Sequence, residues 1–373
     1  MTLLFYPIYG PNWQLNLIEA KKAWDITKGS ASVPIAIIEV PSASGSINNY
    51  DLNHEDLQSN IIYYNDGTQT QHPHGTFVAG CASAVTDNNL GLSSIGFNSS
   101  LMLYRGNHTN NWIDAVNRGA RVINLSFISC SFSSHTNNVV NMLTDLGVVI
   151  LAGAGNGIYP LDHPQYPGQN RASCGPNGNG YGYPASYDNV ISVSSVGEDN
   201  KHWFATDGSG SRHTHNDKVD ICAPGYRVLS TFPNNNYGRS SGTSFSTPIT
   251  AGLVALMLSI APSQELTGVR YLLAQSSDVI ADESNFSGML GAGRINAFKA
   301  LKMTGTRNIY DTTLTGNQVL SAGYGFNVAN SSVDTGSNIS LKARIEVNIE
   351  SSFSVPLGSS FEVIIDPDAI NND

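Results

Sequence analysis

Residues 241–248, which read Ser-Gly-Thr-Ser-Phe-Ser-Thr-Pro, lead directly into an apolar stretch that extends to Leu258. A loop of small hydroxyl residues before a run that is apolar on every side predicts the N-terminus of a buried helix. Unpaired backbone N–H groups converge at such a terminus, and the helix dipole there favours negative charge. Ser244 is therefore placed where a nucleophile that generates an oxyanion would lie. The local pattern alone favours a plain N-cap at Thr243 or Ser244, so the rest of the chain must decide.

Composition limits the classes of protein to which the chain can belong. Only 13% of its 373 residues are charged, and the formal net charge is −10. The length predicts one large domain and a smaller one. Because no basic run occurs, we expect no nucleic-acid partner. No uninterrupted apolar segment reaches the length of a bilayer, so we expect no membrane span.

The four cysteines differ in their surroundings. Cys81 and Cys222 lie in apolar segments and are predicted to be buried thiols. Cys130 and Cys174 lie in loops rich in Gly, Ser and Asn, which favours them as a disulfide pair, although a sequence does not fix connectivity. No pair has the spacing of a zinc site, so no metal is predicted from the cysteines.

Short apolar runs alternate with helical patterns through the first 300 residues. This alternation predicts an α/β fold, a doubly wound and mostly parallel sheet with helices on both faces. The expected strands are 33–39, 101–104, 121–126, 148–152 and 190–193, and the expected helices are 15–26, 112–116 and 138–146.

Two polar residues stand at the ends of these expected elements. Glu39 ends the first strand, and the carboxyl ends of central strands are where ligand-handling groups lie in open α/β sheets. The alternative is that Glu39 is only a solvated residue at the end of a strand. His74 precedes Gly75 and Thr76 at the start of another buried helix. A lone histidine is more often a structural residue than a catalytic one, and His72 is an alternative candidate for the catalytic histidine.

The segment Gly153-Ala154-Gly155-Asn156-Gly157 follows an expected strand. Its glycines allow another backbone, such as that of a substrate, to approach closely. Asn156 offers an uncharged amide N–H₂ group, which suits the binding of an oxyanion. Seen alone, the segment is equally typical of an asparagine in a glycine-rich turn.

Taken in chain order, these residues resemble the acid, His, Asn and Ser of the subtilisin-like serine proteases, the subtilase or peptidase S8 family. The resemblance covers about residues 10–302 and includes motifs on both sides of each residue. The matching motifs are 19–29, His74-Gly75-Thr76 with Val78-Ala79-Gly80, Gly155-Asn156, Gly242-Thr243-Ser244 with Ser246-Thr247-Pro248, and the segments 183–185, 223–225 and 291–297.

The resemblance implies a serine endopeptidase that hydrolyses peptide bonds. Ser244 would be the nucleophile, His74 the general base and Glu39 the acid that orients it, while Asn156 would bind the oxyanion. The peptide would lie along Ser126, Phe127 and Ile128 and along Gly153, Ala154 and Gly155. The alternatives are a catalytically impaired homologue that acts as a binding module, and an esterase or peptide ligase with the same triad.

The chain departs from the family pattern at three positions. The acid is Glu39 where the family has Asp, and Phe77 replaces a second His. Ile128 stands where the family has glycine, so we expect its side chain to narrow or reshape the pocket for the residue before the scissile bond. Asp51 and Asp56, which follow an insertion after the first strand, remain alternative acids.

The resemblance also bears on cofactors, partners and location. No cofactor is required for catalysis, but structural calcium is expected from relatives, with Asp87-Asn88-Asn89 and Glu198-Asp199-Asn200 as oxygen donors. The partner is a protein or peptide substrate, and the chain is expected to be a monomer. We expect a secreted, extracellular or periplasmic protein whose signal segment and pro-segment lie outside this sequence.

From about residue 308 the sequence changes to short segments in which polar and apolar residues alternate. This change predicts a catalytic domain of residues 1–305 and a small all-β domain of residues 306–373. Gly316, Gly336 and Gly358 follow one another at 20 and 22 residues, each in a Gly-polar-polar-apolar pattern. Repetition at this period predicts stacked β-coils that bury a core between repeats. A small β-sandwich is the alternative.

Overall fold

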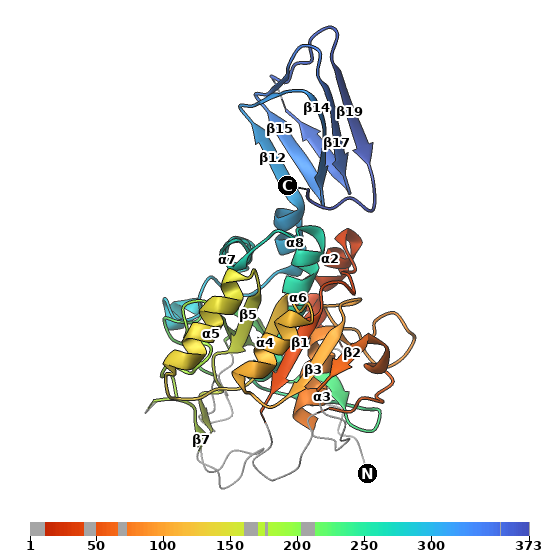
Figure 1. Ribbon diagram of the computed structural model, residues 1–373. Coiled ribbons are helices and arrows are strands. Elements are labelled where there is room, and N and C mark those ends of the chain that lie inside the picture. Colours follow the sequence, from red (N-terminus) through yellow and green to blue (C-terminus); the bar gives the residue numbers. More distant parts are fainter. Residues whose placement is uncertain are drawn as a thin grey trace.

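The computed structural model describes residues 12–40, 50–65, 73–159, 171–175, 178–202, 213–350 and 352–372. His72 and residues 41–49 of the insertion at 41–50 lie outside these residues. The centre is a seven-stranded parallel sheet in the order β2-β3-β1-β4-β5-β8-β9, with helices on both faces (Figure 1). The predicted doubly wound α/β fold is therefore confirmed.

A helix connects β2 to β3, β3 to β4 and β4 to β5. The strands of the sheet are β1 (Ile35–Glu39), β2 (Ile61–Tyr64), β3 (Leu101–Arg105), β4 (Val122–Leu125), β5 (Val149–Gly153), β8 (Ile191–Val196) and β9 (Ile221–Pro224). The helices are α1 (Trp13–Leu17), α2 (Ala20–Ile26), α3 (Pro73–Ser83), α4 (Thr109–Asn117), α5 (Ser134–Asp145), α6 (Thr243–Ile260), α7 (Leu266–Gln275) and α8 (Ala297–Gly305). Two antiparallel pairs lie outside the sheet, β6 (Ile158–Tyr159) with β7 (Arg171–Ala172) and β10 (Val228–Phe232) with β11 (Asn236–Ser240).

Strand β1 shows why the central strands are apolar throughout. All five of its residues are buried. Ile35 and Ile37 join the core beneath α3 and α6, while Ala36 and Ile38 join the core beneath α4 and α5. Both faces of a parallel sheet are covered by helices, so side chains that alternate between the faces are apolar at every position.

The strand order reverses beside β1. Strand β3 pairs with one edge of β1 and β4 pairs with the other. The crevice at the carboxyl ends of strands beside such a reversal is where open α/β sheets bind ligands. Glu39 ends β1 and Ser126 directly follows β4, so the fold brings two of the predicted site residues to this crevice.

Helix α6 is the core helix of the layer. It is long and apolar enough to cross a membrane by composition, but 89% of it is buried within the protein. It packs very closely on α3, because a Cβ added at Gly252 would lie 2.6 Å from the backbone oxygen of Ala82. Only glycine allows the two helix backbones to approach this closely.

The single helix predicted at 15–26 is wrong in one respect. The structure has two short helices, α1 and α2, separated by Glu19 in the left-handed conformation with a φ of 56°. The carboxylate of Glu19 accepts a hydrogen bond of 2.8 Å from Asn296, and Ile18 accepts a 2.8 Å bond from the N–H of Ala297. These contacts with the start of α8 turn the chain, and helical periodicity carries no sign of them.

The C-terminal strands stack as parallel coils. The strands are β12 (Thr306–Tyr310), β13 (Thr313–Leu314), β14 (Asn317–Ala322), β15 (Gly325–Ala329), β16 (Ser332–Val333), β17 (Asn338–Ala343), β18 (Glu346–Ile349) and β19 (Ser360–Ile365). Thr306 pairs with Gly325 and Gly325 with Glu346, all in parallel. Parallel pairing of successive repeats is the arrangement of stacked β-coils and not of an antiparallel sandwich.

This β-coil module attaches to the α/β layer beside α6 and α8, at the end away from the carboxyl ends of the sheet strands (Figure 1). The N–H of Asn371 donates to the carbonyl of Ile260, the last residue of α6, at 2.8 Å. Arg344 donates to the carbonyl of Ile26 at 2.8 Å. Ser244 lies near the other end of α6, about 24 Å away at 1.5 Å of rise per residue.

Candidate active site

Glu39 and His74 form a hydrogen-bonded pair at the crevice. His74 is the second residue of α3, and its Nδ1 lies 2.8 Å from Glu39 Oε2. Glu39 is only 1% exposed, whereas the side chain of His74 is 30% exposed. Burial lowers the pKa of His74, but the negative charge and the hydrogen bond of Glu39 outweigh it and raise this pKa above its ordinary value.

The two alternative acids hold loops instead of the imidazole. Asp51 accepts a 2.7 Å hydrogen bond from the N–H of Asn234. Asp56 accepts a 2.8 Å bond from the N–H of Leu92. Both carboxylates are buried in these contacts. The carboxylate that the structure places against the imidazole is thus that of Glu39.

Ser244 lies at the N-terminus of α6. The helix begins at Thr243 with Gly242 as its N-cap, so neither Thr243 nor Ser244 is the cap that the local pattern favoured. Ser244 N–H is among the first four of the helix, which have no partner within it. The hydroxyl of Ser244 donates to the carbonyl of Ser126 at 3.2 Å, and the ring of His74 lies 5.8 Å from that of the next residue, Phe245.

Thr243 fixes the amide of Asn156. The backbone N–H and the hydroxyl of Thr243 donate to Asn156 Oδ1 at 2.9 and 3.2 Å. A backbone N–H requires an oxygen acceptor, so this contact sets the orientation of the amide and leaves its N–H₂ group as the donor. The same hydroxyl accepts from the N–H of Gly155 at 3.1 Å, which ties the exit of β5 to the start of α6.

The two predicted cleft segments flank Ser244, but their side chains differ in direction. Ser126 Oγ donates to the carbonyl of Ser244 at 2.9 Å. The side chain of Phe127 packs against the core beneath α4 and α5. Ile128 lies on the opposite side of that segment and approaches Gly155, where an added Cβ would be 3.3 Å from Ile128 Cδ1.

Cys130 and Cys174 form a disulfide with an S–S distance of 2.18 Å. It joins the chain just beyond Ile128 to the segment that contains Ser173. Cys81 and Cys222 are free and buried, and burial raises the pKa of both thiols, that of Cys81 to about 12.

An aromatic cluster supports the histidine helix, and the sequence did not reveal it. The ring of Phe77 lies 4.4 Å from that of Phe245 and 5.2 Å from that of Phe232. Phe77 thus packs between α3 and the start of α6, on which the histidine and the serine are carried. The sequence showed that Phe77 replaces a histidine of the family pattern. It did not show the two aromatic partners of Phe77, because they come from distant segments of the chain.

His202, His213 and His215 lie close together, and no local sequence pattern indicated this cluster. His202 Nε2 lies 3.2 Å from His215 Nδ1 and 3.3 Å from the carbonyl oxygen of His213. Burial, reinforced by the neighbouring histidine, lowers the pKa of His202 to about 4, and burial also lowers that of His213. The cluster adjoins the site because the N–H of Thr214 donates to the carbonyl of Gly155 at 2.9 Å.

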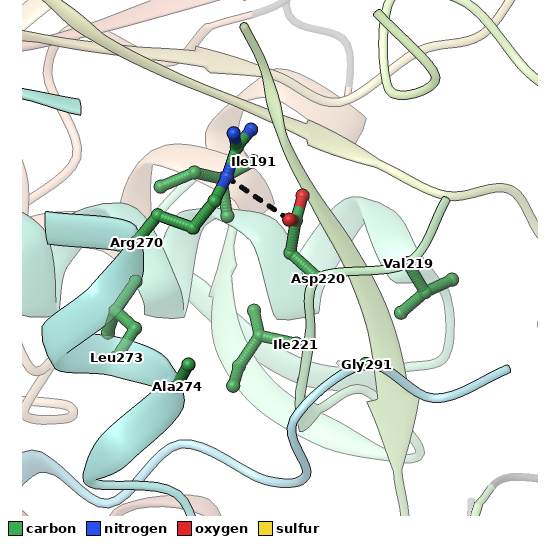
Figure 2. Close-up of a pocket in the computed structure, with 8 residues that line it drawn as sticks. All are labelled: Ile191, Val219, Asp220, Ile221, Arg270, Leu273, Ala274 and Gly291. Carbon is green, nitrogen blue, oxygen red and sulfur yellow. Dashed lines mark ion pairs between the residues drawn. The ribbon is translucent and has the colours of Figure 1, made fainter. Parts of the chain in front are cut away.

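A cavity of about 290 Å³ lies beside α7, apart from these residues (Figure 2). Arg270 and Asp220 form an ion pair of 3.1 Å across it. Asp220 also accepts a 2.8 Å bond from the N–H of Ser192, and burial raises its pKa although Arg270 opposes this. The ion pair joins α7 to the sheet, which is a structural task. The cavity is lined by Ile191, Val219, Asp220, Ile221, Arg270, Leu273, Ala274 and Gly291.

Within the described part of the chain, no group of three or more His, Cys, Asp or Glu is placed to hold a metal ion. Calcium at 87–89 or 198–200 therefore stays a prediction. The loop at 87–89 has internal support, because Asn88 donates to Asp56 at 2.7 Å and its amide oxygen accepts from the N–H of Leu90 at 3.0 Å.

The fold and the crevice define a subtilisin-like protein. The structure of the Prenylagaramide maturation protease PagA aligns with this chain with a TM-score of 0.59 and 21% identity, over 76% of this chain and 98% of that protein. This shows a shared fold. The profile of the subtilase family, Peptidase S8, matches residues 37–326, so the chain belongs to that family.

Named relatives agree with this assignment. Thermitase of Thermoactinomyces vulgaris is 32% identical over 311 residues, which cover 79% of this chain and 95% of the relative. Subtilisin DY of Bacillus licheniformis is 30% identical and covers 75% and 94%. The protein is thus a subtilisin-like serine endopeptidase, and its substrates are proteins or peptides. The matched region runs past residue 305 into the first strands of the β-coil module.

Proposed function

We propose that this endopeptidase acts through Ser244, His74 and Glu39, with Asn156 in the oxyanion site. The observation that carries the proposal is the 2.8 Å contact between Glu39 Oε2 and His74 Nδ1, made beside the N-terminus of the helix that holds Ser244. An imidazole held through Nδ1 presents Nε2 for proton transfer.

The reaction proceeds in two halves. Ser244 Oγ attacks the carbonyl carbon of the peptide as His74 Nε2 takes the hydroxyl proton. The tetrahedral intermediate collapses when His74 returns that proton to the amine nitrogen, the C–N bond breaks, and an acyl-serine ester remains. Water then attacks the ester with His74 as base, and the acid product leaves as Ser244 regains its proton.

Two N–H groups stabilise the charge that develops on the carbonyl oxygen. One is the backbone N–H of Ser244 at the start of α6, where the helix dipole favours negative charge. The other is the N–H₂ group of Asn156, whose orientation Thr243 fixes. Donors that are already oriented need no reorganisation during the reaction.

Glu39 keeps the imidazole in the productive tautomer and balances the imidazolium that forms. Its carboxylate is buried at the end of a strand that is paired on both sides, so it is held in place by the sheet. The chemistry of the site is independent of a bound metal in this scheme.

We also propose an oxidising location, that is, a secreted or periplasmic protein. The Cys130–Cys174 disulfide supports this location, because such bonds persist outside the reducing cytosol.

Covalent labelling tests the proposed mechanism. Diisopropyl fluorophosphate should modify Ser244 in the wild type, and Ser244→Ala should lose both labelling and peptide hydrolysis while it keeps the wild-type melting temperature. Ser131→Ala, a matched change at an exposed serine of the same region, should change neither. Turnover by Ser244→Ala at the wild-type rate would refute the nucleophile. A folded wild type without labelling or turnover would favour the binding-module alternative, and ester turnover or aminolysis without peptide hydrolysis would favour the esterase or ligase.

A further inference from the structure

The space for the acyl-side residue of a substrate is bounded by two segments of backbone. On one side, Ser126 exchanges hydrogen bonds with Ser244 at 2.9 and 3.2 Å, so the chain from Ser126 to Ile128 passes directly beside the nucleophile. On the other side, Gly155 is tied to Thr243. A carbonyl carbon at Ser244 Oγ, with its oxygen towards Asn156, must project the side chain of its own residue between these segments.

Ile128 occupies the space between the two segments. A Cβ built on Gly155 would lie 3.3 Å from Ile128 Cδ1, and one built on Gly182 would lie 3.4 Å from Ile128 Cγ2. Both distances are at or inside ordinary van der Waals contact. The isoleucine therefore reaches from its own segment to the space that a side chain at Gly155 or Gly182 would occupy, and the walls that it faces there carry no side chain of their own.

The wall that carries Ile128 is fixed in place. Ser129 and Tyr183 exchange two backbone hydrogen bonds of 2.7 and 2.8 Å, and the Cys130–Cys174 disulfide follows one residue later. Ile128 is also β-branched, so its first side-chain torsion is restricted. The side chain cannot be displaced cheaply by a substrate.

The facing wall is equally constrained. The N–H of Thr214 donates to the carbonyl of Gly155 at 2.9 Å, and the hydroxyl of Thr214 donates to the carbonyl of Gly178 at 2.9 Å. The Cβ position of Gly155 also lies 2.8 Å from Thr214 Oγ1 and 3.3 Å from Ser173 Oγ. The side chains named here, Ile128, Thr214 and Ser173, carry no charge.

We propose that Ile128 closes the primary side-chain pocket, so that the enzyme cleaves after glycine or alanine and rejects leucine, phenylalanine and charged residues at that position. This inference rests on the proposed function, because it assumes that Ser244 attacks the carbonyl of the residue that enters the pocket. A larger side chain would have to overlap Ile128 in a packed space, which is strongly unfavourable.

The test uses fluorogenic peptides that differ only in the residue before the cleaved bond, with Gly, Ala, Leu or Phe there. For the full chain we expect kcat/KM for alanine to exceed that for phenylalanine by about 100-fold or more, given that one methylene in an apolar pocket changes discrimination about 10–200-fold. Ile128→Gly should raise the phenylalanine-to-alanine ratio by at least about 10-fold, and Ile128→Ala and Ile128→Val should give a graded series. Ile349→Gly, at an exposed position of the β-coil module, should leave the ratio unchanged.

Labelling by diisopropyl fluorophosphate separates the possible failures, because neither of its isopropoxy groups has to enter the pocket for the serine to be phosphorylated. It also reports the fraction of intact sites in each variant, so a poorly folded Ile128→Gly does not obscure the ratio. A wild type that is labelled but cleaves after phenylalanine as well as after alanine would overturn this inference alone. An unchanged ratio in all three Ile128 variants would do the same. A folded wild type that is not labelled would overturn the inference together with the proposed function.

Discussion

Asn156 Oδ1 accepts two hydrogen bonds from Thr243, one from the backbone N–H at 2.9 Å and one from the hydroxyl at 3.2 Å. Thr243 immediately precedes Ser244, the proposed nucleophile, so the proposed oxyanion donor is positioned by the same stretch of chain. The hydroxyl that completes this arrangement also accepts from the N–H of Gly155. The start of α6 and the exit of β5 are thus coupled through one side chain.

This coupling predicts different costs for two substitutions. Asn156→Ala should lower kcat by about 10²–10³, the range measured when one oxyanion donor is removed from subtilisin, with little change in KM. Thr243→Val should lower kcat by about 10-fold, since it removes about one net hydrogen bond from the amide. Thr243→Ser keeps the hydroxyl that donates to Asn156, so this variant should retain most of the wild-type rate. Steady-state kinetics on one peptide decide the matter, and an effect of Asn156→Ala confined to KM would exclude the oxyanion role.

Glu39→Gln should change both the rate and its pH dependence. The glutamine favours the wrong tautomer of His74, so kcat/KM should fall by about 10⁴ as for the equivalent change of a triad acid. Glu39 supplies both effects that raise the pKa of His74, and burial alone lowers it. Activity needs neutral His74, so the acid limb of the residual pH profile should move to lower pH than in the wild type.

The wild-type limb should lie above pH 6.5, because the folded pKa of His74 is raised. Ser244→Ala provides the background rate for these measurements. A limb that stays in place in Glu39→Gln, or full activity in that variant, would show that another group orients the imidazole, and Asp51→Asn would then be the next variant to measure.

Glu39→Asp should be impaired as well, although aspartate is the residue that the family has here. The shorter side chain draws the carboxylate back by about 1.5 Å, one bond length. The present contact of 2.8 Å would open to about 4.3 Å, because β1 is paired along both edges and cannot shift alone. We expect kcat/KM closer to that of Glu39→Gln than to the wild type. Equal activity of the two acids would show that α3 moves to follow the carboxylate.

The sequence predicted the parts of this site that depend on local pattern. A hydroxyl loop before an apolar run indicated the helix start at Ser244, and α6 begins at Thr243. Glycine and threonine after His74 indicated a second helix start, and α3 begins at Pro73. The recurring glycines of the C-terminal segment indicated stacked coils, and the repeats pair in parallel. In each case the signal and the structure lie within a few residues of each other.

What the sequence did not yield depends on contacts between distant segments. The break at Glu19 follows from its bond to Asn296, far along the chain. The choice between Glu39 and Asp51 as the acid depends on which carboxylate the fold places against His74. Glu39 contacts His74, whereas Asp51 accepts a hydrogen bond from Asn234, and both partners are distant in sequence. The approach of Ile128 to Gly155 and Gly182 needs three segments to meet, so the sequence indicated a side chain at position 128 but not the two glycines that it faces.

Removal of the disulfide should lower stability without abolishing the chemistry. The bridge spans 44 residues, and closing a loop of that length restricts the unfolded chain by about 4 kcal/mol in the loop-entropy picture, with about 2–4 kcal/mol typical in practice. Denaturant unfolding of Cys130→Ser/Cys174→Ser should show a loss in this range. Thiol counting under denaturing, non-reducing conditions should find two free thiols in the wild type, Cys81 and Cys222. Four free thiols would contradict the bridge.

The buried histidines predict a loss of stability in acid. His202 is 2% exposed, and its pKa is lowered from 6.5 to about 4, first by burial and then by His215. A depressed pKa means that the folded state needs the neutral form. Its contribution is therefore complete above pH 6.5 and is lost as the pH falls from 6.5 towards 4. The loss is about 1.4 kcal/mol per pH unit and about 3 kcal/mol in all, and His213 acts in the same direction.

The described groups that face His202 set the design of the measurement. The imidazole of His202 contacts the ring of His215 and the carbonyl oxygen of His213. Asp282 accepts a hydrogen bond of 2.8 Å from the backbone N–H of His202, and the ring of Phe286 lies 4.8 Å from the His202 ring. His74 titrates with the opposite sign, because its raised pKa favours the folded state at low pH. Carboxylates also respond to acid, so a wild-type curve alone would mix several groups.

The decisive quantity is the difference between the wild type and His202→Gln in the free energy of unfolding, measured from pH 7.5 to 4.5. Because the variant cannot take up the proton, the wild type should lose more stability than the variant over this interval, by about 3 kcal/mol at most. His135→Gln, at an exposed histidine of α5, should give parallel curves with the wild type. Parallel curves for His202→Gln as well would show that His202 is not the group that titrates. If His202→Gln loses less stability than the wild type as the pH falls, His202 is a group that makes the fold sensitive to acid. This group lies close to Gly155, because Thr214 of the neighbouring segment donates to the carbonyl of Gly155.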